Sequence, residues 1–225
     1  MPLLFCLAAG TCSAQAPGWA ASPGPQAIPA TRPVPYPGTL QLAVDATDLD
    51  HHVMHVQQTV PVAQAGRLTL LYPHWIPGHH SRTGDVTKLA NLQMQAGGRP
   101  LPWRRDTINP MAFHVEVPAG VGQLELSFDY LSPLGREGGR IEMTRQMLGV
   151  QWDQVLLYPA GHAASQIRVQ PRLKLPTGWQ QGSALRAPDG GLPQAGADGW
   201  VAYRALSIET LVDSPVFAGR HLQRI

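Results

Sequence analysis

The stretch AFHVEVPAGVGQLELSFDY, residues 112–130, indicates most directly which kind of fold this chain adopts. Apolar side chains alternate with polar ones along both halves, at Phe113, Val115 and Val117 and then at Leu124, Leu126, Phe128 and Tyr130. Alternation with a period of two places one face of a strand on a core, and a short link containing glycine is typical of a turn. The stretch is therefore predicted to be a β-hairpin with one buried face.

The same alternation continues along the chain. It recurs in TLQLAVDA (39–46), LTLLYP (68–73), IRVQPRLKL (167–175) and GWVAYRALSIET (199–210). A Gly97-Gly98 turn separates two further short strands in NLQMQAGGRPLPW (91–103). Pro171 lies on the apolar row of its strand, and proline lacks the backbone donor of a ladder, so this strand is predicted to lie at an edge or to carry a bulge.

Helical patterns are scarce in this sequence. The best candidate is TGDVTKLANLQMQ (83–95), where Thr83 or Asp85 is placed to cap one or two turns. Elsewhere glycine and proline interrupt every longer window. The sequence predicts an all-β, β-sandwich-like domain of roughly ten to twelve strands, with at most a short helical turn.

The N-terminal region predicts export. LLFCLAAG (3–10) is a short apolar core, and Ala14-Gln15-Ala16 fits the small-x-small cleavage pattern, although no Lys or Arg precedes the core. Residues 1–16 are therefore predicted to be a signal peptide, whose removal would also remove Cys6 and Cys12. Seven prolines follow within residues 17–37, which predicts a disordered leader over 17–38 and a domain over 39–225. The expected location is the periplasm or the outside of the cell.

Composition excludes several partners. The formal net charge is +2, and the 17 basic residues are scattered singly apart from Arg104-Arg105, whereas a nucleic-acid surface needs clustered positive charge. The apolar N-terminal stretch is too short to span a membrane. Arg104-Arg105-Asp106 is interpreted as a solvated ion pair, and Gln151-Trp152-Asp153 as a packed tryptophan whose polar neighbours face water.

Motifs for catalysis are missing. Nine histidines include His51-His52-x-x-His55 and His114-x-Glu116, but the chain has no His-Glu-x-x-His for a zinc hydrolase, and the second pair lacks the cysteines of a deaminase. Gly-x-Ser-x-Gly and phosphate-binding glycine loops are also missing. Paired carboxylates for glycoside cleavage stay open, because their spacing is spatial. No catalytic residue and no metal ligand is assigned.

The most unusual stretch is YPHWIPGHHSRTGD, residues 72–85. One hypothesis makes it a rigid corner, in which Pro73 and Pro77 fix φ, Gly78 provides the turn and Trp75 packs onto the top of the sandwich. The other makes it a loop that faces a substrate or a neighbouring domain, since a rigid scaffold can aim a loop at a ligand. The candidate site residues are Trp75, Pro77, Gly78, His79, His80 and Arg82.

A family resemblance covers most of the chain. The run from Thr59 to Pro133, TVPVAQAGRLTLLYPHWIPGHHSRTGDVTKLANLQMQAGGRPLPWRRDTINPMAFHVEVPAGVGQLELSFDYLSP, resembles the N-terminal domain of the glycyl-aminopeptidase family, metallopeptidase family sixty-one. Three more segments are similar to the same family: QVLLYPAG (154–161), IRVQPRLKLPTGW (167–179) and LVDSPVFAGRHLQRI (211–225). Members of the family are bacterial zinc peptidases with an N-terminal β domain, a thermolysin-like catalytic domain and a PDZ domain.

The resemblance implies a function without local catalysis. The His-Glu-x-x-His helix of the family would follow SPVFAGR (214–220), so none of the zinc ligands can be assigned to this sequence. We expect a non-catalytic accessory domain, present as a fragment, that packs against the catalytic domain in cis or in trans and helps to frame the cleft for a peptide substrate. Zinc is expected only in that catalytic domain. The alternative is a free-standing periplasmic β-sandwich that binds a peptide or a glycan.

Overall fold

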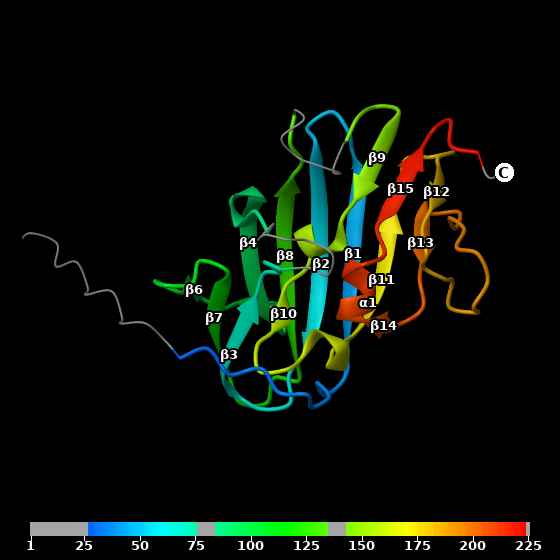
Figure 1. Cartoon of the computed structure of the whole chain (residues 1–225). Helices are drawn as coiled ribbons and strands as arrows, with labels where there is room; N and C mark the ends of the chain where they lie inside the picture. Colours follow the sequence, from blue (N-terminus) through cyan, green and yellow to red (C-terminus); the bar gives the residue numbers. More distant parts are fainter. Residues whose placement is uncertain (1–26, 76–83, 135–142, 224–225) are drawn as a thin grey trace, which may run out of the picture.

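Figure 1 shows the computed structural model of the chain, which describes residues 27–75, 84–134 and 143–223. These residues form fifteen strands, one five-residue α-helix and three short 3-10 turns. The predicted all-β, sandwich-like fold is confirmed. The strands outnumber the predicted ten to twelve because several are only two or three residues long, which is too short for alternation to reveal.

One large sheet is the frame of the fold. Its order is β13-β11-β1-β2-β8-β4-β5, and β14 also pairs with β11. Its strands are β1 (Thr39–Asp48), β2 (Val53–Pro61), β4 (Leu89–Ala96), β5 (Arg99–Pro100), β8 (Gln123–Leu131), β11 (Arg168–Lys174), β13 (Trp200–Ala202) and β14 (Leu206–Ser207). All of its neighbouring strands are antiparallel except β1 and β11, which run parallel.

Two smaller sheets cover one face of the large sheet, together with the helix (Figure 1). The four-stranded sheet contains β10 (Tyr158–Pro159), β3 (Gly66–Leu71), β7 (Ala112–Val117) and β6 (Trp103–Arg105). The three-stranded sheet contains β12 (Gln180–Gly182), β15 (Val216–Gly219) and β9 (Met147–Val150). The remaining elements are α1 (Ile208–Val212), η1 (Val86–Lys88), η3 (Trp152–Gln154) and η4 (Ala164–Gln166).

The predicted hairpin over residues 112–130 is wrong. Strand β7 pairs with β3 and β6 in the four-stranded sheet, whereas β8 pairs with β2 and β4 in the large sheet. The link between them, where Gly120 has a φ of 80°, carries the chain from one sheet to the other. Alternation correctly identified the buried face of each strand. It does not identify which strand lies alongside, because the buried faces of β7 and β8 point into the same core whether or not the two strands pair.

Three smaller predictions have clear outcomes. Gly97 and Gly98, with φ values of 54° and 74°, form the predicted turn between β4 and β5. Asp85 caps the single turn η1 by accepting a hydrogen bond from the Thr87 amide at 3.1 Å. Pro171 lies neither at an edge nor at a bulge, because β11 pairs with β14 before it and with β13 after it. Pro171 therefore lies at the gap between β14 and β13, where its lack of a backbone N–H breaks no ladder hydrogen bond.

Packing begins before the predicted domain start at Thr39. Tyr36 belongs to the core, its amide donates to the Gln166 carbonyl at 2.9 Å, and its hydroxyl donates to the Pro61 carbonyl. Its ring also meets His162 edge to face, with the ring centroids 5.1 Å apart. The part of the predicted leader nearest to Thr39 is therefore attached to the domain.

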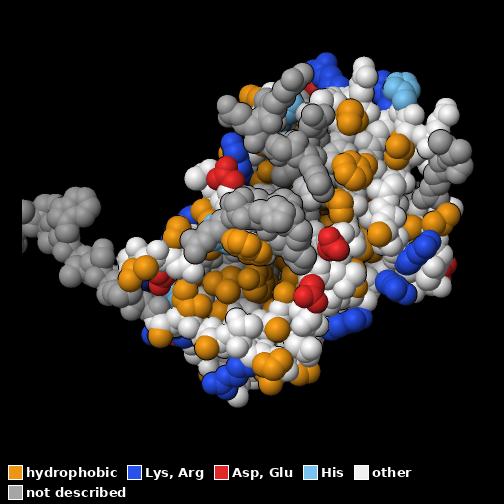
Figure 2. Space-filling model, viewed as in Figure 1, with side chains coloured by type: hydrophobic (Ala, Val, Ile, Leu, Met, Phe, Trp, Pro, Cys, Tyr) orange, Lys and Arg blue, Asp and Glu red, His pale blue; other side chains and the backbone are white. Residues whose placement is uncertain are grey.

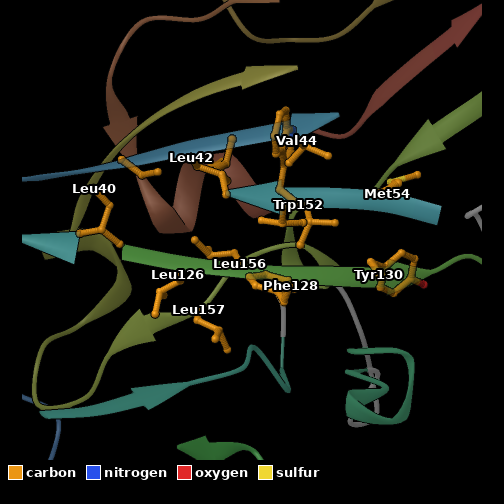
Figure 3. Close-up of a cluster of buried hydrophobic side chains, with 14 of the residues drawn as sticks. Leu40, Leu42, Val44, Met54, Leu126, Phe128, Tyr130, Trp152, Leu156 and Leu157 are labelled. Carbon is orange, nitrogen blue, oxygen red and sulfur yellow. The ribbon is translucent and has the colours of Figure 1, made fainter. Parts of the chain in front are cut away.

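The residues 152–157, which we call the inner segment, run through the middle of the core. They lead from β9 to β10, and Figure 3 shows Trp152, Leu156 and Leu157 lying against side chains of the large sheet. The Trp152 indole donates to the Ser214 carbonyl at 2.9 Å. The prediction that the polar neighbours of Trp152 face water is wrong for Asp153, which is buried and accepts from the side-chain amide of Gln154 at 2.6 Å.

A buried glutamine fixes the inner segment to the large sheet. Gln58 lies on the inner face of β2, and its side-chain amide donates to the Leu157 carbonyl and accepts from the Leu157 amide at 3.1 Å. This reciprocal pairing replaces the ladder bonds that an irregular buried segment would otherwise lack. Both the donor and the acceptor of the Gln58 side chain, on the apolar face of β2, therefore have hydrogen-bond partners.

Replacement of Gln58 by alanine is expected to destabilise the fold by about 3 kcal/mol, because it leaves the amide and the carbonyl of Leu157 buried without partners. Gln57→Ala is a matched control, since its side chain is the neighbouring one on the exposed face of the same strand, and we expect a change below about 0.5 kcal/mol. Urea unfolding measures both values. Equal destabilisation by the two substitutions would contradict the role given to Gln58.

Candidate functional site

The candidate loop of residues 72–85 begins from a fixed position. Tyr72 directly follows β3 and is buried, and its amide donates to the Met111 carbonyl at 2.8 Å. Its hydroxyl is placed to donate to the backbone carbonyl of Gln154, at 3.1 Å, and to the side-chain oxygen of the same residue, at 3.0 Å. The loop therefore starts on a residue that is bonded to the inner segment.

The returning end of the loop lies against its beginning. A Cβ atom placed on Gly84 would lie 2.0 Å from the Pro73 carbonyl oxygen and 3.0 Å from the His74 Cα atom, so only glycine fits there. The requirement comes from close backbone approach, since Gly84 is not among the residues with positive φ. We call Tyr72, Pro73, His74, Gly84 and Asp85 the loop neck.

The loop neck has a defined electrostatic environment. Burial raises the pKa of Tyr72 above its usual range, and the charges of Asp153 and Asp85 contribute to the same shift. The pKa of Tyr130, on β8, is raised for the same reasons. Both phenols therefore stay protonated and neutral at physiological pH, beside two carboxylates. The two phenols and Asp153 are buried, so Asp85 is the exposed carboxylate of the loop neck.

Trp75 does not pack as predicted. Its exposed fraction is 61%, so the hypothesis that it plugs the top of the sandwich is wrong for this residue. Pro73, in contrast, is buried, as expected of a rigid corner. Pro77, Gly78, His79, His80 and Arg82 lie outside the described residues, and their role stays a prediction. The view in Figure 2 shows further hydrophobic side chains at the surface of the face shown in Figure 1, with only scattered charges among them.

The interpretation of Arg104-Arg105-Asp106 as a solvated ion pair is also wrong. Asp106 is buried, and its carboxylate bonds to His114 Nε2 at 2.9 Å and accepts from the amides of Ile108 and Asn109. The Arg105 guanidinium lies over the Phe113 ring, 4.9 Å from its centroid. Asp106 thus pairs with His114 on β7. The residues next to Asp106 in the sequence do not indicate this partner.

The histidines that the structure describes do not converge on a metal site. His114 uses both ring nitrogens, with Thr69 Oγ1 at 2.9 Å from Nδ1, whereas Glu116 is exposed and pairs with Arg67. Within residues 27–75, 84–134 and 143–223, no group of three or more His, Cys, Asp or Glu is placed to hold a metal ion. In the same ranges, no helix is long and apolar enough to cross a lipid bilayer.

His51 and His55 lie on the outward side of the large sheet. His51 Nδ1 lies 2.8 Å from Asp48 Oδ1, and His55 Nδ1 lies 2.7 Å from Asp129 Oδ1. The hydrogen bond to Asp129 raises the pKa of His55, and partial burial opposes this shift. His51 pairs with Asp48 three residues earlier in the same turn, whereas His55 pairs with Asp129 across β2 and β8.

Comparison with known proteins identifies the family. The model of the peptidase M61 N-terminal domain matches residues 41–220. This chain belongs to the peptidase M61 N-terminal domain family. No curated protein sequence gives a significant match to it. The family match covers the loop neck, the inner segment and all three sheets, as the sequence resemblance predicted.

A solved structure shares the fold of this M61 domain. An aminopeptidase N family protein from Idiomarina loihiensis superimposes with a TM-score of 0.65 at 16% identity, over 80% of this chain and 29% of that protein. An M1 zinc metallopeptidase from Deinococcus radiodurans, bound to a Tyr-Ser-Ala substrate, gives a TM-score of 0.47 at 11% identity, over 83% of this chain and 42% of that protein. The M61 domain thus spans well under half the length of either structure.

Several residues of the loop neck, and Gln154 of the inner segment, were not recognised from the sequence. Tyr72 continues the alternation of β3 beyond Leu70, which is a detectable pattern. Gly84 carries no such pattern, because its requirement arises only where the two ends of the loop meet. Gln154 lies on a three-residue turn, where no periodicity distinguishes buried side chains from exposed ones.

Gly84→Ala is expected to destabilise the M61 domain by about 2 kcal/mol, because a methyl group there cannot coexist with the Pro73 carbonyl. Gly122→Ala is the control, since a Cβ at Gly122 meets nothing within 4 Å and its φ is not positive. We expect Gly122→Ala to leave the urea midpoint unchanged or slightly higher. A neutral effect of Gly84→Ala would show that the loop neck opens readily.

Proposed function

We propose that this M61 domain is the non-catalytic N-terminal accessory domain of a secreted zinc aminopeptidase. It packs against the catalytic domain and helps to frame the substrate cleft. The observation that supports this proposal most strongly is the family match over residues 41–220, which places the whole described fold in a peptidase family. The aminopeptidase N family protein that shares the fold is longer, and this domain covers 29% of it.

The loop neck supports a contact role for this region. Trp75 is exposed on a loop whose two ends are held together at Gly84 and whose base is bonded to the core through Tyr72. A large aromatic side chain on a rigid base loses little conformational entropy on binding, which is why aromatic residues are common in interfaces. The loop would therefore present Trp75, together with His79, His80 and Arg82, to the catalytic domain or to the peptide.

The division of chemistry between the domains follows from the residues present. The catalytic domain would supply the zinc ion and the general base, in cis or in trans. The M61 domain would supply shape, and the exposed carboxylate of Asp85 at the loop neck would favour a positively charged ligand group there. Export to the periplasm is proposed from the apolar segment and the Ala14-Gln15-Ala16 pattern.

A chimeric enzyme tests this function. The M61 domain replaces the N-terminal domain of an active M61 peptidase, and three variants are compared with the parent chimera: Trp75→Ala, the triple substitution His79→Ala/His80→Ala/Arg82→Ala, and Ile108→Ala. Ile108 is the control, because it is 73% exposed and belongs to a different loop. We expect the first two variants to lower kcat/KM by about 10-fold, or about 1.4 kcal/mol, with an unchanged melting temperature.

Two results would contradict the proposed role of the loop. If the first two variants lower the melting temperature strongly while each folded molecule keeps normal activity, residues 72–85 form only a structural corner. If the chimera folds but Trp75→Ala and Ile108→Ala leave kcat/KM unchanged alike, the loop does not frame the cleft.

A further inference from the structure

The outer face of the large sheet, opposite the core, carries an unusual set of side chains. Strand pairing aligns them in two neighbouring rows across the sheet. The first row is Ala202, Arg172, Ala43, Gln57, Ser127 and Gln93. The second row is Gln170, Gln41, Thr59, Glu125 and Gln95. Five of these eleven residues are glutamines, and the two charged residues lie in different rows.

The two rows enclose a trough. Ala43 and Ala202 are short, whereas their neighbours are long, and the resulting hollow of about 380 Å³ crosses β2, β1 and β11. Its polar lining comes from Gln41, Gln57, Thr59, Gln170 and Arg172. A second hollow, of about 630 Å³, shares Ala202 with the first and reaches Trp200. The trough therefore extends along the sheet toward an aromatic side chain.

The amides in the trough are available to a ligand. Among the described residues, Gln57, Thr59 and Gln170 have no side-chain hydrogen bond to the protein, and Gln41 has only a 3.5 Å contact with the Thr39 carbonyl. A glutamine amide offers two donors and one acceptor in a plane. Three such amides and a hydroxyl around one hollow match a ligand that has many hydroxyl groups.

The charge of the trough favours a neutral ligand. No carboxylate lines the first hollow, and Asp189 in the second accepts from the Gly191 amide at 2.8 Å. The Arg172 guanidinium lies over the Trp200 ring, 4.3 Å from its centroid. The next row of the outer face is charged, but its groups are paired, with Lys174 at 3.3 Å from Asp45 and His55 at 2.7 Å from Asp129. An anionic or cationic polymer would meet no matching run of charge here.

We propose that this trough binds a neutral oligosaccharide. Sugar hydroxyls would pair with the amides of Gln41, Gln57 and Gln170, while the apolar faces of the sugar rings would lie on Ala43, Ala202 and the exposed part of Trp200. An extended peptide fits less well over β2, β1 and β11, because its backbone needs the free edge of a sheet and these three strands are already paired on both sides, whereas β13, which carries Ala202, is an edge strand. The proposal does not depend on the peptidase role, which concerns a different part of the molecule.

Three neutral hexasaccharides, namely maltohexaose, cellohexaose and N-acetylated chitohexaose, are suitable probes for titration of the full chain by NMR and calorimetry. We expect at least one of them to bind with a Kd below about 1 mM, a range typical of a single shallow site. The double variant Gln57→Ala/Gln170→Ala is expected to weaken binding at least about 10-fold, through the loss of two hydrogen-bonding groups. Ala202→Tyr, at an exposed position, should abolish binding by filling the trough.

Gln123→Ala is the matched control, because this glutamine belongs to the same sheet but does not line the trough, and it should bind like the parent chain. Circular dichroism confirms that each variant is folded. The proposal is overturned if none of the three sugars binds. It is also overturned if the double variant and Ala202→Tyr, when folded, bind as tightly as the control.

Discussion

The reciprocal hydrogen bonds between Gln58 and the backbone of Leu157 are the constraint on which the rest of the structure depends. The inner segment is irregular and lies between the large sheet and the two smaller ones, so its backbone polar groups need partners away from water. Gln58 provides two of these bonds from the middle of β2. The segment then carries Trp152, Leu156 and Leu157 into the core at fixed positions.

The candidate site is built on the same segment. Gln154 follows Trp152 by two residues and accepts the Tyr72 hydroxyl, so the base of the loop is bonded to the core itself. Gly84 then closes the loop neck against Pro73. The core, the hydrogen-bonded Tyr72 at the base of the loop and the close backbone approach at Gly84 together hold Trp75 in an exposed position. The outer face of the large sheet carries none of these constraints, which leaves its side chains available for a different ligand.

Part of this structure could be predicted from the sequence. Alternation located most of the long strands and their buried faces, though not β2, and the glycine pair at 97–98 located a turn, because these features depend on residues within about ten positions of each other. The pairing of β7 and β8, the burial of Asp106 beside His114, and the exposure of Trp75 could not be predicted. The first two depend on which distant strand lies alongside, and residue type alone does not specify that neighbour. The family resemblance bridged this gap for the fold but not for individual side chains.

Hydrogen exchange at two amides tests the central role of the inner segment most directly. The Leu157 amide is bonded to Gln58, and the Tyr72 amide, at the base of the loop, is bonded to Met111. If the core and the loop neck form one cooperative unit, both amides exchange only through global unfolding, with the same opening free energy as urea unfolding gives. Exchange of either amide at a much lower opening free energy would contradict this account, because the loop base would then open independently of the core.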